Sequence, residues 1–152
     1  MFRRLILLLI LLTLLTGCRW LKLKMGIGYT VTNPEEESPQ WVVQQVLKAA
    51  AKEPFSDAWR AYTQYLHSSE KDTRVGLKDW ETLRFPALRR KHRCFLRDAG
   101  PFSYLVKEER EVRDDYVQLR VLCKTTDTPT PCHLFKDPNA NGKWRVKMNC
   151  LN

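Results

Sequence analysis

The spacing of hydrophobic and polar positions changes twice along the chain and divides it into three parts. The first part is an apolar run from Leu5 to Leu15, in which Thr13 is the one polar residue. The middle part repeats apolar residues at spacings of three and four, which is typical of helices. The last part alternates apolar and polar residues, which is typical of strands. Helices followed by strands predict a single α+β domain over residues 38–152, with the helices packed on one face of a curved antiparallel sheet.

The helical part contains three predicted helices. Ser38-Pro39 marks the start of the first, because a hydroxyl caps a helix and proline is tolerated in its first turn. Pro86 is expected to interrupt the third, because proline lacks the N–H that a helix interior requires. The predicted helices span 39–51, 56–66 and 77–91, and the polar stretch 68–75 is expected to form a turn.

The strand part contains five predicted strands separated by turn signals. Their alternation predicts one buried face and one wet, basic face. The strands are expected at 92–98, 102–107, 115–124, 131–136 and 143–150. The residues expected on the buried face include Val117, Leu119, Val121, Cys123, Trp144, Val146, Met148 and Cys150.

Residues 19–32 also alternate, with apolar side chains at every second position. Such a pattern is that of a strand, but two glycines and three basic residues fit a membrane-proximal tether equally well. We therefore treat residues 18–37 as a spacer or an added strand.

The amino terminus has the order of a secretory signal, with two arginines, an apolar core and small residues before Cys18. Leu15-Thr16-Gly17-Cys18 resembles the lipobox of bacterial lipoproteins. The resemblance implies removal of residues 1–17 and acylation of Cys18, which would hold the protein on a membrane. The alternatives are an ordinary signal peptide or an uncleaved anchor. Because Arg19 is not the aspartate that retains many lipoproteins in the inner membrane, the resemblance favours the outer membrane of a bacterial envelope, with the domain periplasmic or surface-exposed.

Charge and cysteines add two expectations. The formal net charge is +9, which suits anionic head groups or another envelope partner, whereas export disfavours nucleic acid. With Cys18 lipidated, an even set remains for two disulfides in an oxidising compartment. Of the three possible pairings, the hairpin spacing favours Cys123–Cys132, which leaves Cys94–Cys150. No zinc or redox motif is present, and we expect no cofactor.

The element order and the D-P-N-A-N-G-K-W-R-V stretch resemble the nuclear transport factor 2-like superfamily. This resemblance implies a cone-like sheet around a long helix, over roughly residues 38–150. The family includes isomerases and dehydratases as well as non-enzymatic binding domains.

Two motifs are candidates for binding. Asp137–Gly142 matches the opening of a calcium loop, but position twelve is Met148 and Asn-Gly is itself a hairpin signal, so a turn is favoured. A basic run near the helix-to-strand junction is interpreted first as a solvated face and second as a site for a phosphate-bearing envelope ligand. Its possible anion-binding residues are Arg84, Arg89, Arg90, Arg93 and Arg97.

No motif assigns a catalytic residue. The sequence therefore predicts a lipid-anchored envelope protein with a small non-catalytic binding or assembly domain. An isomerase- or dehydratase-like enzyme that uses the interior of the cone is the alternative, and a structural lipoprotein in a larger assembly is a third hypothesis.

Overall fold

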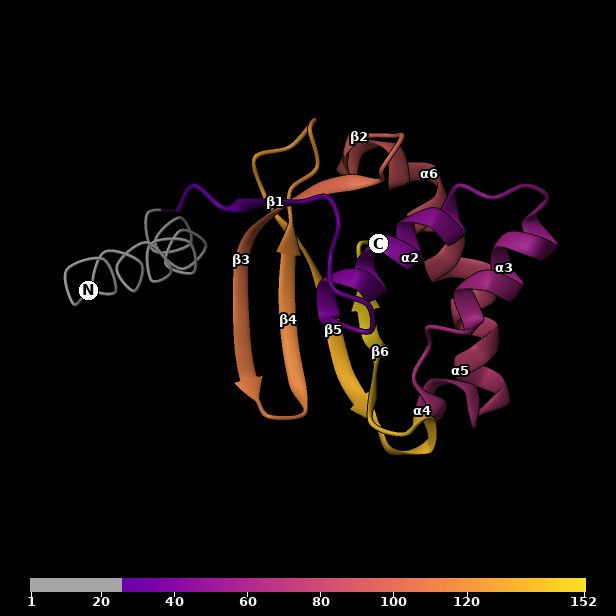
Figure 1. Ribbon diagram of the computed structural model, residues 1–152. Coiled ribbons are helices and arrows are strands. Elements are labelled where there is room, and N and C mark those ends of the chain that lie inside the picture. The colour runs from indigo at the N-terminus through magenta and orange to yellow at the C-terminus, as the bar shows by residue number, and fades with distance from the viewer. Residues whose placement is uncertain (1–25) are drawn as a thin grey trace, which may run out of the picture.

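The computed structural model of the protein describes residues 26–152. They form an α+β fold in which most helices precede the strands, as the hydrophobic pattern predicts (Figure 1). The helices are α2 (Pro39–Ala50), α3 (Phe55–Thr63), α4 (Ser68–Lys71), α5 (Arg74–Asp79), the π-helix η1 (Trp80–Arg84), α6 (Phe85–Phe95) and the 3₁₀ turn η2 (Pro138–Ala140). The strands are β1 (Tyr29–Val31), β2 (Leu96–Asp98), β3 (Ser103–Arg113), β4 (Tyr116–Val121), β5 (Thr130–Asp137) and β6 (Lys143–Cys150).

The strands form one open antiparallel sheet in the order β1-β3-β4-β5-β6, and β2 pairs with the beginning of β3. Val117, Leu119 and Val121 of β4 are all buried, so the predicted alternation of this strand is confirmed. Helix α2 contacts both β4 and β6, and the helices cover this one face of the sheet (Figure 1).

Helix α2 begins where the sequence predicts. The Ser38 hydroxyl accepts a hydrogen bond from the Trp41 backbone N–H at 3.1 Å, which satisfies a donor that the helix itself leaves free. Pro39 occupies the first turn, where its missing N–H costs nothing. The apolar side of the helix is fully buried and includes Val42, Val43, Val46 and Leu47.

The predicted interruption at Pro86 is wrong, and the predicted strand at 92–98 is confirmed only at its last three residues. Helical structure continues from α5 through η1 and α6 to Phe95, and only Leu96–Asp98 is a strand. The wide π turn lies directly before the proline, and the Phe85 N–H bonds to the Trp80 carbonyl five residues back. This wider turn opens the helix where the proline ring would otherwise meet the preceding carbonyl.

Two smaller expectations also need correction. The polar stretch 68–75 contains the short helix α4 and the start of α5, capped by His67 and Thr73 respectively. Met148 is exposed, because the pairing of β5 with β6 shifts register between Cys132 and Leu134. A bulge of this kind turns side chains to the opposite face, which pattern reasoning cannot anticipate.

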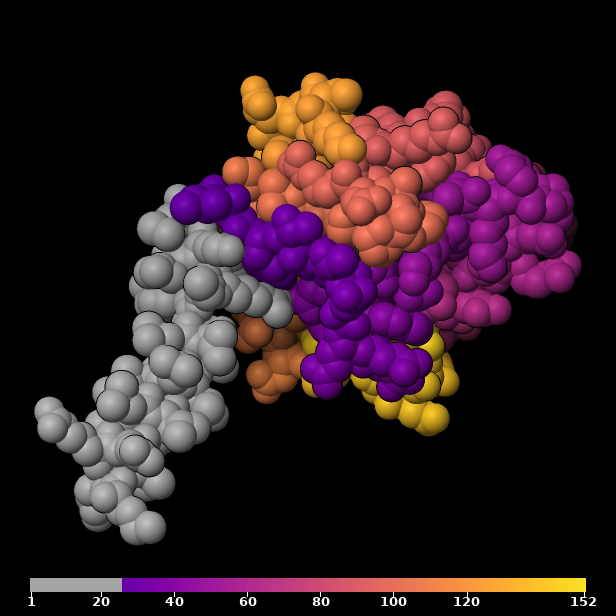
Figure 2. Space-filling model, turned by 45° about the horizontal axis from the view of Figure 1, so that its top comes forward, coloured from indigo at the N-terminus to yellow at the C-terminus, as the bar shows by residue number. Residues whose placement is uncertain are grey.

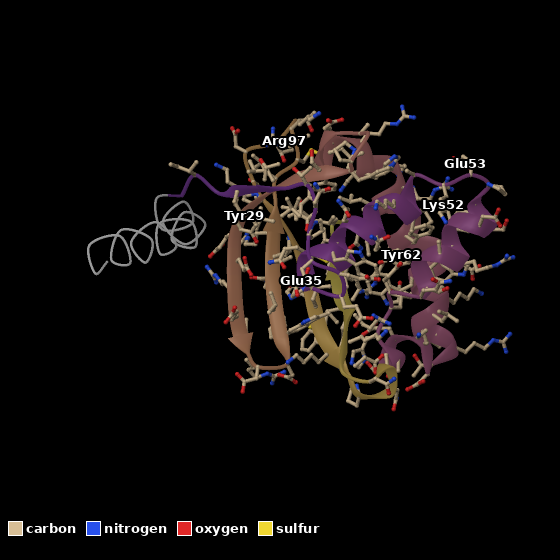
Figure 3. The ribbon with its side chains drawn as sticks, viewed as in Figure 1. Tyr29, Glu35, Lys52, Glu53, Tyr62 and Arg97 are labelled. Atoms are coloured by element: carbon tan, nitrogen blue, oxygen red, sulfur yellow. A yellow bond between two sulfur atoms is a disulfide. The ribbon has the colours of Figure 1, made fainter. Side chains whose placement is uncertain are left out.

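The space between helices and sheet is filled by large side chains. Tyr62, Trp80, Phe85 and Tyr104 are fully buried there, and the Tyr62 and Phe85 rings stack with centroids 4.5 Å apart. Figure 3 shows Tyr62 within this interior. Burial raises the pKa of the Tyr62 phenol far above its ordinary value.

The segment before α2 contributes an edge strand. Tyr29–Val31 pairs with Tyr104–Val106 of β3, so this part of the alternating stretch belongs to the sheet. The predictions for residues 1–17, Cys18 and the rest of the alternating stretch up to residue 25 lie outside the described residues. Within residues 26–152, no helix combines the length and apolar character that a bilayer span requires.

Candidate anion-binding site

The basic run predicted at the helix-to-strand junction lies mostly on α6. Because helical structure continues to Phe95, Arg90 and Arg93 are three residues apart on one helix and therefore neighbours on its surface. Both side chains are exposed, as is that of Lys91, which lies between them in the sequence. In a strand, Arg90 and Arg93 would have pointed to opposite faces.

A disulfide joins this helix to the segment that follows β4. Cys94 and Cys123 are bonded, and the backbone N–H of Lys124 donates to the Cys94 carbonyl at 2.8 Å. Lys124 thereby lies beside α6, although it is far from the basic run in sequence. Its ammonium group donates to the Arg97 carbonyl at 3.4 Å, which connects it to β2.

The predicted pairing Cys123–Cys132 and Cys94–Cys150 is wrong, although all four cysteines form disulfides. The bonds are Cys94–Cys123 and Cys132–Cys150. The β4–β5 register places Cys132 opposite Leu119, and β6 places Cys150 opposite Cys132. Cys123 lies beyond the last pair of that hairpin, next to the last turn of α6.

Two hollows of about 780 and 600 Å³ border this junction. The first lies between α6 and the end of α2, and the second lies between α6 and the β4–β5 connection. Arg90, Arg93 and Lys124 line both hollows, so they stand on the ridge that separates them. The second is also lined by Thr125, Thr126 and Thr130; the Thr125 hydroxyl contacts Cys123 Sγ, and the Thr126 hydroxyl donates to the Thr128 carbonyl.

We define the basic cluster as Arg90, Lys91, Arg93, Arg97 and Lys124. All five side chains are exposed, and none forms an ion pair with any described residue. No carboxylate is among the residues that line the second hollow. Figure 2 shows α6, β2 and the β4–β5 connection together on the face turned toward the viewer, and Figure 3 labels Arg97 at the same end.

Arg89 has a different role. Its guanidinium donates to the Ala50 carbonyl at 3.2 Å and to the Lys52 carbonyl at 2.9 Å, and it pairs with Glu53 at 2.6 Å. These bonds satisfy carbonyls at the end of α2, where the helix has no donors of its own. Glu53 is the carboxylate that lines the first hollow, and Arg89 already neutralises it.

Arg84 also lies apart from the basic cluster. It pairs with Asp79, donates to the Met148 carbonyl and lies over the Trp80 ring at 4.8 Å. Of the five arginines predicted as an anion site, Arg90, Arg93 and Arg97 therefore remain available, whereas Arg84 and Arg89 hold the fold together.

The calcium-like stretch forms a turn, as favoured. Asp137 is buried and accepts hydrogen bonds from the Ser68 N–H at 2.7 Å, the Ser68 hydroxyl at 2.8 Å and the Asn139 N–H at 3.0 Å. Burial alone would raise the pKa of Asp137, but these bonds and nearby His67 outweigh it and hold the pKa below its ordinary value of 3.8. No group of three potential metal ligands occurs within residues 26–152.

The uncovered face of the sheet carries an aromatic stack that the sequence analysis missed. The rings of Tyr116 and Phe135 stack with centroids 4.2 Å apart, and the Tyr116 hydroxyl hydrogen-bonds His133 Nδ1 at 2.7 Å. Arg113 lies over Tyr116 and Lys147 over Phe135, so the outer ring faces are already occupied. Burial lowers the pKa of His133. This ladder is cross-strand packing rather than an open platform.

The arrangement in the basic cluster suits an anionic ligand. Arginine offers fixed N–H donors that match phosphate or carboxylate oxygens, lysine offers a mobile point charge, and threonine hydroxyls add neutral donors. The sequence analysis missed Lys124 and the threonines. Only the Cys94–Cys123 pairing could have placed them beside α6.

Comparison with known proteins finds no matching family model, no curated relative and no solved structure that matches the chain. The geometry and charge of the basic cluster are therefore the basis for a functional proposal.

Proposed function

We propose that this is a lipid-anchored cell-envelope protein whose α+β domain binds phosphate-bearing anions and performs no catalysis. The basic cluster carries the proposal, because five exposed cations gather there without a carboxylate partner. Like charges held close together repel one another, so an arrangement of this kind is stabilised when an anion binds between them.

The shape of the site supports a phosphate group in particular. Arg90 and Arg93 face both hollows from one helix, and Lys124 approaches them from the β4–β5 connection. Two guanidinium groups and one ammonium group can surround a tetrahedral anion and supply several charge-assisted hydrogen bonds. The Thr130 hydroxyl, on the second hollow, would add a neutral donor.

Binding at the surface rather than chemistry in the interior is supported by the packing. The interior is occupied by Tyr62, Trp80, Phe85 and Tyr104, and the buried carboxylate of Asp137 already accepts three hydrogen bonds. An isomerase- or dehydratase-like reaction would need an acid or a histidine that faces an open interior. A cone-like curvature of the sheet remains part of the proposal, supported by the register shifts in β3, which bend strands.

Anchoring through Cys18 is tested separately from anion binding. In a host with lipoprotein processing, the wild-type chain should incorporate labelled palmitate, and Cys18→Ala should remain an unlabelled precursor. Labelling of Cys18→Ala would contradict the anchor. Fractionation of the labelled protein into inner and outer membranes tests the proposed outer-membrane location.

Anion binding is tested by calorimetry of the acylated mature protein in neutral detergent, titrated with sodium tripolyphosphate at low ionic strength. Arg90→Gln with Arg93→Gln should weaken binding at least about tenfold, because two charge-assisted contacts are lost. Arg74→Gln with Lys78→Gln removes the same charge from exposed positions on α5 and should leave binding unchanged. Equal losses in both variants, or no binding by the wild type, would refute the proposed function.

A further inference from the structure

The basic cluster lies at the same end of the domain as the beginning of the described chain. Tyr104 of β3 is the register partner of both Val31 in β1 and Leu96 in β2, so these two short strands flank one residue of β3. At the same end, the Lys107 ammonium donates to the Gly26 carbonyl at 3.3 Å. Figure 1 shows β1, β2 and the β4–β5 connection at the same end of the sheet.

Chain length keeps this end close to the proposed anchor. Gly26 follows Cys18 by eight positions. A chain spans at most about 3.6 Å per residue, so Gly26 lies within about 29 Å of an acylated Cys18. A short tether raises the effective concentration of the cluster at the bilayer surface, so even weak individual contacts become favourable.

We infer that the basic cluster docks the domain on anionic head groups of the membrane that holds its own anchor. The inference rests on the proposed function, because it assigns the phosphate-bearing anion to lipid head groups in that leaflet. Basic residues close to an anionic surface each add about fivefold to membrane association. Asp98 and Asp127 lie on the same segments as Arg97 and Lys124, and the five cations of the cluster outnumber them.

An exposed apolar side chain supports the same orientation. Ile27 is 55% exposed and lies between Gly26 and the edge strand β1. The free energy of a large apolar side chain falls when the side chain moves from water into the interfacial region of a bilayer. A basic cluster and an exposed isoleucine, both at the end of the sheet where the described chain begins, have the chemistry of a membrane contact rather than of a solvated face.

The test uses lysines as reporters within one protein. The acylated protein is reconstituted in phosphatidylcholine vesicles with or without phosphatidylglycerol, and lysine acetylation by a water-soluble reagent is followed by mass spectrometry. Lys91 and Lys124 should react at least about fivefold more slowly when the anionic lipid is present. Lys71 and Lys78 are exposed on α4 and α5 and should react equally in both membranes.

Two further arms separate the possible sources of phosphate. Free tripolyphosphate added to the phosphatidylcholine vesicles tests the proposed function alone, because no anionic lipid is present. If tripolyphosphate slows the acetylation of Lys91 and Lys124 (that is, protects them) and phosphatidylglycerol does not, the docking inference is overturned and the proposed function stands. The absence of protection in both arms would overturn both proposals.

Further controls test whether the slower acetylation depends on the basic cluster and on the membrane that holds the protein's own anchor. Arg90→Gln with Arg93→Gln should abolish the protection of Lys124, whereas Arg74→Gln with Lys78→Gln should preserve it. Equal protection of all four reporter lysines, or protection only when phosphatidylglycerol is supplied in separate vesicles, would overturn docking on the membrane of the protein's own anchor.

Discussion

The charged side chains in two polar regions of this domain differ in burial and in whether they have internal partners. At the end of β5, Asp137 is 1% exposed and accepts three hydrogen bonds, from Ser68 and Asn139. At the end of α6, Arg90, Arg93 and their neighbours are exposed and form no ion pair with described residues.

The difference follows from solvation. A buried carboxylate without partners would be very costly, so Asp137 persists inside only because each bond compensates part of its lost hydration. Exposed cations keep their hydration and cost little without partners. Internal partners thus mark a charge that serves the fold, and their absence marks a charge available to a ligand.

The largest expected effect comes from removing the buried carboxylate. Asp137→Ala leaves the Ser68 and Asn139 donors unsatisfied and should lower the free energy of unfolding by about 3 kcal/mol in urea titrations. Asp98→Ala is a matched control, because exposed Asp98 accepts one bond, from the Gly100 N–H at 3.0 Å, and should cost less than about 1 kcal/mol. Similar losses in the two variants would remove the distinction between the regions.

Protonation of Asp137 at acid pH should also lower the free energy of unfolding. The loss should be smaller than in Asp137→Ala, because protonation leaves the side chain in place. The pKa of Asp137 is lower in the folded state than its ordinary value of 3.8. Its contribution to stability is therefore complete above about pH 3.8 and is lost as the pH falls through the lower folded-state value. Thermal unfolding of wild type and Asp137→Asn should show a difference that shrinks across this acidic window; a constant difference would contradict the assignment.

Arg89 and Arg90 are adjacent on α6 and should differ in their contribution to the free energy of unfolding, by less than Asp137 and Asp98 do. Arg89→Gln removes donors from the carbonyls of Ala50 and Lys52 and should lower the free energy of unfolding by about 1 to 2 kcal/mol. Arg90→Gln removes the same charge one position later, breaks no bond within the described structure and should stay within about 0.5 kcal/mol of wild type. Chemical denaturation measures both, and equal effects would show that Arg90 has a structural partner.

The smallest effect on stability is expected inside the basic cluster. Arg90→Gln with Arg93→Gln relieves repulsion between like charges and should stabilise the domain by about 0.2 to 0.5 kcal/mol at low salt. The gain should vanish at high salt, because ions screen exposed charges. Thermal unfolding at two ionic strengths distinguishes this from a destabilisation, which would indicate that the two arginines support the fold.

Local features of the fold were predictable. Ser38-Pro39 starts α2 because the cap and the first turn involve only neighbouring residues. The alternation of Val117, Leu119 and Val121 identified the buried face of β4, because side chains of a strand alternate whatever it pairs with. The basic run was also visible, but the separation of Arg90 and Arg93 from Arg84 and Arg89 was not.

The amino-acid sequence by itself determined that most helices precede the strands, which face of β4 is buried, that four cysteines follow Cys18, and that basic residues are in excess. Each of these depends on composition or on residues a few positions apart. Tertiary structure alone decided that the helix continues past Pro86, that Cys94 bonds Cys123, and that Lys124 joins the arginines of α6. These outcomes depend on strand register and on contacts between distant segments, for which short-range patterns carry no information.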